Sequence, residues 1–266
     1  METDTRPLVE ANGSAGAARY ELRLGGDSAD DQHEETFEVE LDGEWRELRS
    51  HDYDVIFSHP GLYEQLFHVE LDCRSPEAVT RVLRSVFSER PGHAPPRILD
   101  VGAGNGMVAE QLATLEPEYI VGLDILPEAA EAAWRDRPDL YSAYHVMDLT
   151  DMTDPSWHAL EDDHFDCMTT VAALGFADIP PPAFVNAFNL VADGGLIAFN
   201  LKDAFLDGED DTGFARLIRH MFDEGVLVLS GQEHYRHRLS VAGEPLHYVA
   251  FVGEKHCPVP PDWDLE

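Results

Sequence analysis

The sequence predicts an α/β fold, with a doubly wound, mostly parallel seven-stranded sheet, an antiparallel last strand and a small N-terminal extension. Three observations predict it. From residue 97 onward, short apolar runs alternate with amphipathic helical patterns, as in parallel sheets covered by helices on both faces. A glycine-rich turn directly follows the first of these runs. Near the end, two strand-like runs flank a turn that contains Gly243 and Pro245, which indicates a terminal hairpin.

The first fifty residues carry weak patterns. Residues 1–18 are small, polar and aperiodic, so we expect a disordered leader. Phe37, Val39 and Leu41 then alternate with glutamates and are followed by Asp42 and Gly43, which is typical of a strand and a hairpin turn. We therefore expect a small β-rich extension over residues 19–50.

Residues 51–96 have a helical pattern. Aromatic residues and leucines recur at helical spacing between residues 53 and 67, and Pro60 and Gly61 interrupt them, which predicts short helices with a bend. Ser75, Pro76 and Glu77 then mark a helix start, because Ser can cap the helix, Pro suits its first position, and Glu favours the positive end of its dipole.

Residues 97–256 contain the main predicted domain, and residues 257–266 are expected to form a C-terminal tail. The domain's strand-like runs are residues 97–101, 119–123, 143–147, 167–172, 195–199, 226–239 and 246–253. A helix is expected over residues 213–225, before the final hairpin.

The charge is strongly negative, with 52 Asp and Glu residues against 18 Lys and Arg residues, for a formal net charge of −34. Such a surface repels phosphates, so we expect neither a nucleic acid nor a membrane as partner. Adaptation to high salt, where ions screen the self-repulsion, is one interpretation. The other interpretation is that the protein is acidic without being adapted to high salt.

The three cysteines limit which kinds of site and which cellular compartment are expected. Cys73, Cys167 and Cys257 are odd in number and form no CxxC pair, so neither a disulfide framework nor a zinc site is expected, and we predict no metal. No signal-peptide pattern and no apolar run of about 18 residues occurs, so a reducing cytoplasm is the expected location. The oligomeric state stays open.

The strongest motif runs from Ile98 to Gly106 and reads ILDVGAGNG. A buried strand leads into a glycine-rich turn, where the backbone can approach a ligand and the next helix presents its positive end. The glycines are spaced G-x-G-x-G, whereas the dinucleotide fingerprint is G-x-G-x-x-G, so a dinucleotide-binding site is disfavoured.

Three aspartates stand at or near predicted strand ends, 24 residues apart: Asp100, Asp124 and Asp148. The carboxyl ends of parallel strands share one edge of the sheet, so we expect these side chains to converge on one crevice. Asp124 can accept hydrogen bonds from two ribose hydroxyls, and Asp148 from an adenine amine. Capping of the following helices is the alternative role.

These residues resemble the motifs of class I S-adenosylmethionine (SAM)-dependent methyltransferases. Residues 98–106 look like the first motif, Leu123-Asp124-Ile125 like the ribose-binding second, and Met147-Asp148-Leu149 like the adenine-contacting third. The resemblance implies a Rossmann-like methyltransferase fold over residues 97–256, SAM as cofactor, and a helical lid within residues 51–96. The predicted cofactor-binding residues are Arg74, Asp100, Gly102, Ala103, Gly104, Asn105, Gly106, Asp124, Ile125, Asp148, Leu149, Val171 and Ala172.

The acceptor is expected to be a small molecule, uncharged or cationic. The fourth strand runs into Ala172-Ala173-Leu174-Gly175-Phe176 rather than an N-P-P-Y motif, so methylation of bases or of glutamine amides is not indicated. In-line displacement chiefly needs alignment and desolvation, with a base only if the nucleophile carries a proton. Candidate catalytic residues are His59, Tyr63 and His237, with a structural role as the alternative for each.

Two other functions remain open. A non-catalytic module could hold SAM or its product S-adenosylhomocysteine (SAH) without transferring a methyl group. A dinucleotide-dependent oxidoreductase could use the same kind of sheet.

Overall fold

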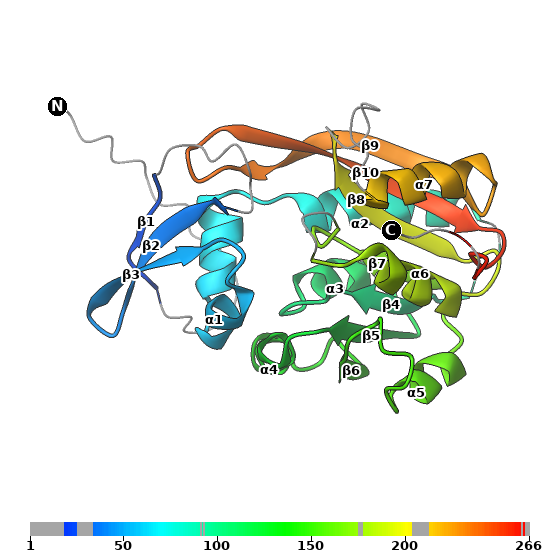
Figure 1. Cartoon of the computed structure of the whole chain (residues 1–266), viewed down its shortest axis with the longest axis horizontal. Helices are drawn as coiled ribbons and strands as arrows, with labels where there is room; N and C mark the ends of the chain where they lie inside the picture. Colours follow the sequence, from blue (N-terminus) through cyan, green and yellow to red (C-terminus); the bar gives the residue numbers. More distant parts are fainter. Residues whose placement is uncertain are drawn as a thin grey trace.

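The computed structural model describes residues 19–25, 34–90, 92, 94–174, 178–203, 213–261 and 263. The predicted leader, residues 1–18, lies outside the described residues, as does part of the predicted tail. Within them the chain forms a three-stranded sheet and a seven-stranded sheet (Figure 1).

The small N-terminal sheet is antiparallel and consists of β1 (Leu22–Arg23), β2 (Thr36–Leu41) and β3 (Glu44–Arg49). Along β2 the alternation seen in the sequence sets the buried face, because Phe37, Val39 and Leu41 are each at most 2% exposed. This face packs against the next segment, which contains α1 (Tyr53–Ser58) and the π-helical η2 (Glu64–Glu70).

The large sheet has the order β6-β5-β4-β7-β8-β10-β9. Its strands are β4 (Arg97–Val101), β5 (Tyr119–Asp124), β6 (Ala143–Val146), β7 (Cys167–Thr170), β8 (Leu196–Lys202), β9 (Leu227–Leu239) and β10 (Pro245–Lys255). The first five are parallel, and β10 lies antiparallel between β8 and β9. The predicted fold class, with its antiparallel last strand, is confirmed.

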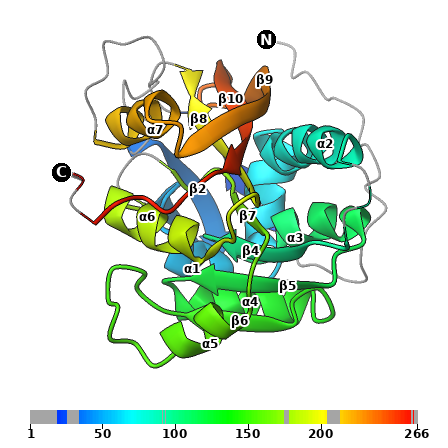
Figure 2. The ribbon, with the colours of Figure 1, turned by 90° about the vertical axis from the view of Figure 1, so that its right-hand side faces the viewer.

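Helices cover both faces of the large sheet (Figure 2). One face packs against α2 (Ser75–Ser88), α3 (Met107–Leu112) and α4 (Pro127–Asp136); a 3₁₀ turn, η3 (Ala113–Leu115), follows α3. The other face packs against α5 (Trp157–Asp162), α6 (Pro181–Leu190) and α7 (Gly213–Asp223), around the fully buried rings of Phe184, Phe188 and Phe199. This double cover explains why the parallel strands read as nearly continuous apolar runs.

The β9–β10 hairpin extends beyond the large sheet toward the N-terminal sheet (Figure 1). There Arg238 forms an ion pair with Glu35 at 2.5 Å, with the two side chains only 5% and 3% exposed. Glu35 also accepts a hydrogen bond from the Val241 backbone amide, and Leu239 donates one to the Leu71 carbonyl. Because removing one partner would leave a buried unpaired charge, these contacts fix the N-terminal segment to the hairpin.

Candidate functional site

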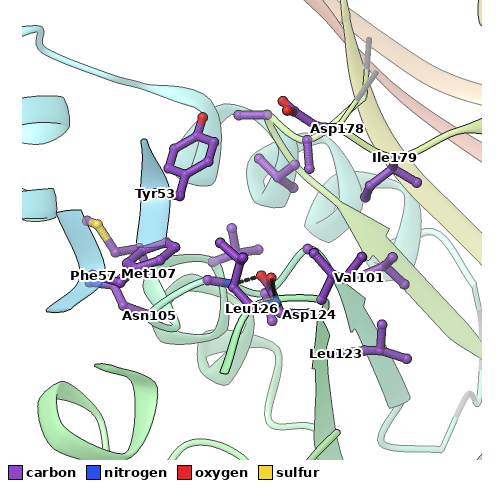
Figure 3. Close-up of a pocket in the computed structure, with 18 of the residues that line it drawn as sticks. Tyr53, Phe57, Val101, Asn105, Met107, Leu123, Asp124, Leu126, Asp178 and Ile179 are labelled. Atoms are coloured by element: carbon purple, nitrogen blue, oxygen red, sulfur yellow. Dashed lines mark hydrogen bonds between the residues drawn. The ribbon is translucent and has the colours of Figure 1, made fainter. Parts of the chain in front are cut away.

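A cavity of about 390 Å³ lies at the carboxyl ends of β4, β5 and β7, under α1 and η2 (Figure 3). Most of the residues predicted from the strand-end motifs meet here. Those that line the cavity are Gly102, Ala103, Gly104, Asn105, Asp124, Ile125, Asp148, Leu149, Val171 and Ala172, together with the candidate catalytic residue Tyr63.

At Gly102 and Gly104 the loop after β4 lies too close to its neighbours for a side chain. Gly102 has a φ of +68°, and a Cβ atom there would lie 2.8 Å from the Cβ of Ala173. The backbone amides of Gly102 and Ala103 donate to the Leu123 carbonyl at 2.8 and 3.0 Å, which ties the loop to β5. The loop therefore presents bare backbone to the cavity.

Asp124, at the end of β5, holds the same loop. Its Oδ2 accepts from the Gly104 amide and its Oδ1 from the Leu126 amide, each at 3.0 Å, and Figure 3 shows the carboxylate at the cavity floor. Burial raises the pKa of Asp124, and these amides oppose the rise. Each carboxylate oxygen can accept further hydrogen bonds, so the residue fits a ligand with two neighbouring hydroxyls.

Asp148 stands after β6 and is exposed at the cavity rim. Its Oδ1 accepts from the backbone amide and the hydroxyl of Thr150, at 2.8 and 2.7 Å, which fixes the direction of the carboxylate. The neighbouring Met147 and Leu149 are buried and add an apolar wall. An apolar surface beside a hydrogen-bond acceptor such as the Asp148 carboxylate suits a flat heterocycle that carries an amine.

Asp100 lies behind the loop and outside the cavity lining. It is 1% exposed, and its two oxygens accept from the hydroxyls of Tyr141 and Thr169, at 2.8 and 2.7 Å. Burial raises the pKa of Asp100 to about 6. The Tyr141 hydroxyl also reaches the Ala103 carbonyl at 3.4 Å, so Asp100 supports the loop from the core side.

Residues 99–199 match the family described as a methyltransferase domain. Over these residues the chain is a class I SAM-dependent methyltransferase domain. The match runs from β4 to β8 and so includes the glycine loop, Asp124 and Asp148. SAM is the cofactor of this family.

A malonyl-[acyl-carrier protein] O-methyltransferase of Geobacter sulfurreducens is 32% identical over 122 residues, covering 46% of this chain and 43% of that protein. The chain therefore spans less than half the length of this relative. Among solved structures, the N-methyltransferase NodS from Bradyrhizobium japonicum has a TM-score of 0.46 at 16% identity, covering 67% of this chain and 86% of its own. A SAM-dependent methyltransferase from Clostridium acetobutylicum has a TM-score of 0.49 at 12% identity, covering 73% and 96%.

In the part of the chain that the structure describes, no helix combines the length and the apolar character that a bilayer crossing requires.

The helices of the predicted lid, α1 and η2, form hydrogen bonds with the glycine loop and with α4 of the methyltransferase domain. Arg137 Nη1 donates to Glu64 Oε1 at 2.8 Å and to the Asn105 carbonyl at 3.1 Å. The side-chain Nδ2 of Asn105 also donates to Glu64 Oε1, and Arg135 donates to the Phe57 carbonyl. Glu64 Oε2 is buried and has no hydrogen-bond partner among the described residues, so this junction retains an acceptor for a further donor.

Arg74, Gly106 and His59, also predicted as site residues, do not line the cavity of the methyltransferase domain. Arg74 is exposed and pairs with Asp72 at 2.7 Å. Gly106 lies under Arg137, where a Cβ would approach the Arg137 side chain to 3.1 Å. His59 Nδ1 bonds the Val55 carbonyl of its own helix at 2.8 Å.

His237, the remaining candidate catalytic residue, lies in a buried polar network behind the cavity. Its Nδ1 is 2.6 Å from Ser75 Oγ, which bonds the Tyr235 hydroxyl. Asn200 donates to Tyr235 and accepts from the Ala172 amide at 2.7 Å. Ala172 has a φ of +56°, an unfavourable value for a residue with a side chain. The network therefore holds the strained backbone at the end of β7, and burial keeps the pKa of His237 well below its ordinary value.

Several residues that line the cavity were not predicted as site residues. They include His51, Tyr53, Phe57, His68, Cys73, Pro76, Met107 and Asp178. Tyr53 and Phe57 stack with ring centroids 5.9 Å apart, and Phe57 stacks on Tyr63 at 4.9 Å. The one sequence signal was the recurrence of aromatic residues at helical spacing outside the main domain, which core packing explains equally well.

Proposed function

We propose that this chain transfers a methyl group from SAM to a small-molecule acceptor. The observation that carries the proposal is Asp124, whose carboxylate is oriented by the amides of Gly104 and Leu126 beside two glycines that leave no room for a side chain. The cavity is covered by the lid helices, which favours an acceptor small enough to be enclosed.

The residues present fit SAM. We infer that Asp124 receives the ribose hydroxyls, that Asp148 and Leu149 receive the adenine, and that residues 102–105 surround the methionine part. The bare backbone of the loop supports this, because a Cβ at Gly104 would approach the Phe57 ring of the lid to 3.1 Å. When bound, SAM supplies a methyl group activated by the positive charge on its sulfur.

The chain's own contribution is alignment and exclusion of water. Burial raises the pKa of Tyr63, so its phenol stays protonated near neutral pH and can act as a wall or a donor, not as a base. Burial also lowers the pKa of His68, which keeps this cavity imidazole neutral. Holding the acceptor in line with the methyl group then accounts for the rate enhancement.

We do not assign the methyl acceptor of the Geobacter sulfurreducens relative to this chain. None of the described residues that line the cavity is Arg or Lys, whereas an anionic acceptor is commonly held by such side chains. The same feature disfavours a nucleic acid. The three cysteines are unpaired thiols, which supports the reducing cytoplasm as location.

The test is calorimetric binding of SAM, SAH, NAD and NADP to the full chain, followed by transfer of labelled methyl. SAM and SAH should bind, and Asp124→Asn should weaken both by about tenfold or more, because the amide cannot accept all of the hydrogen bonds of the carboxylate. Asp139→Asn makes the same charge change at an exposed position outside the cavity and should have no effect.

Binding of NAD but not of SAM would identify an oxidoreductase instead. Binding of SAM and SAH without transfer of labelled methyl to any acceptor would instead support the alternative function, a non-catalytic module that holds SAM or SAH.

A further inference from the structure

The lining of the cavity extends beyond the residues assigned to SAM. This further part comes from the lid helices and from the segment after β7, and includes Tyr53, Tyr63, His68 and Asp178. Tyr53 and Tyr63 belong to one aromatic stack, with centroids 6.4 Å apart, and burial raises the pKa of both phenols. The rings therefore stay neutral and offer electron-rich faces.

The charge of the cavity lining is one-sided. The acids on it are Asp124, Asp148 and Asp178, and none of the described lining residues is Arg or Lys. Asp124 and Asp148 stand on the side of the glycine loop and β6, whereas Asp178 follows β7.

Asp178 and Tyr53 face the same space. Figure 3 shows the Asp178 carboxylate and the Tyr53 hydroxyl on one side of the cavity, opposite Asp124. Burial raises the pKa of Tyr53, and the negative charge of Asp178 adds to this rise. Asp178 is itself exposed, so water reaches it at the rim.

We propose that the methyl acceptor is a small arylalkyl amine that enters as a cation, with its ammonium at Asp178 and beside the ring of Tyr53. This inference rests on the proposed function and specifies its substrate class. A carboxylate gives an ammonium a charge-assisted hydrogen bond, and an aromatic face attracts the same charge. The absence of Arg and Lys from the described lining leaves an anion without a guanidinium or ammonium partner.

The transfer balances without a further reactant. The ammonium first gives one proton to water at the rim. Its nitrogen lone pair then forms the N–C bond as the C–S bond breaks, the electron pair of that bond stays on sulfur, and the positive charge passes to nitrogen. Asp178 thus faces a cation before deprotonation and again after transfer.

The experiment measures binding of phenethylamine, 2-phenylethanol and 3-phenylpropanoate to the full chain saturated with SAH. The amine should bind at least about tenfold more tightly than the alcohol, and the carboxylate should not bind measurably. If the alcohol or the carboxylate binds as tightly as the amine, the proposal is overturned. Failure of SAH itself to bind would instead refute the proposed function.

Variants at Asp178 and Tyr53 locate the effect, each with a matched control. Asp178→Asn should lower the affinity for the amine about tenfold and leave that for the alcohol unchanged, while Asp139→Asn should change neither. Tyr53→Leu should weaken amine binding, and Tyr53→Phe should retain it, because the phenyl face is kept.

If Asp178→Asn weakens binding of SAM but not of SAH, the carboxylate serves the sulfonium charge and the assignment is wrong. Because Asp178 is exposed, this variant can be measured even if Tyr53→Leu does not fold.

Discussion

Asp100 stands at the end of β4, and its carboxylate accepts hydrogen bonds from two hydroxyls in the core. Its folded-state pKa of about 6 lies above the ordinary value of 3.8, because burial disfavours the charge more than Tyr141 and Thr169 stabilise it. The folded state therefore retains the proton of Asp100 to a higher pH than the unfolded state does.

The sign of the resulting pH dependence can be tested with Asp100→Asn. The raised pKa makes the contribution of Asp100 to stability most favourable below about pH 4, and this advantage is lost as the pH rises through 6. Asparagine does not titrate, so the stability of the variant relative to the wild type should increase between pH 4 and pH 7, by up to about 3 kcal/mol. Urea unfolding of both proteins across this range measures the difference in stability. The contributions of the other carboxylates are the same in both proteins and cancel. A difference that stays flat or falls would contradict the buried, raised-pKa assignment.

The lid helices are joined to the methyltransferase domain through few polar groups. Arg137 follows α4 and bridges Glu64 of η2 and the Asn105 carbonyl of the glycine loop, with its side chain only 12% exposed. Because one side chain contacts both the lid and the loop, movement of the lid and binding at the loop should be coupled.

Arg137→Gln should therefore loosen the lid and weaken SAH binding together. We expect a loss of unfolding free energy of about 3 kcal/mol, as for a buried ion pair that loses one partner, and an affinity for SAH that is lower by about fivefold or more. Urea unfolding and calorimetry measure these two quantities.

Arg49→Gln is the matched control, since Arg49 is 62% exposed and pairs with Asp52 on the surface. It should cost less than about 1 kcal/mol and leave SAH binding unchanged. Equal effects of the two variants would mean that the Arg137 bridge is no more than a surface pair.

At the scale of the whole molecule, the net charge of −34 is the dominant long-range term. The attractive pairs are local, such as Arg238 with Glu35, while the remaining carboxylates repel one another across the surface. Repulsion of this kind opposes the compact state and is screened by salt, with a Debye length of about 10 Å at 0.1 M and about 3 Å at 1 M.

The melting temperature should rise as KCl increases from low to multimolar concentration. Sucrose at matched osmolality serves as control, because it favours compact states without screening charge. A rise that KCl produces and sucrose does not reproduce would favour the high-salt interpretation of the composition. A melting temperature that stays level or falls in KCl would instead favour the other interpretation, that the protein is acidic without being adapted to high salt.

The sequence by itself determined the fold class, the succession of strands and helices along the chain, and the meeting of the glycine loop with Asp124 and Asp148. These features depend on local signals: apolar periodicity, glycine spacing and position at a strand end, which neighbouring residues set. The general rule that parallel strands share a carboxyl edge then brings distant motifs together without knowledge of side-chain packing.

Only the tertiary structure decided where the remaining side chains point. The partners that turn Asp100 into the core lie 41 and 69 residues away, and Ser75, the partner of His237, is 162 residues away. The aromatic wall at Tyr53 likewise depends on how the lid packs over the sheet. Such contacts join residues far apart in the chain through burial and packing of the whole fold, and no local pattern in the sequence records them.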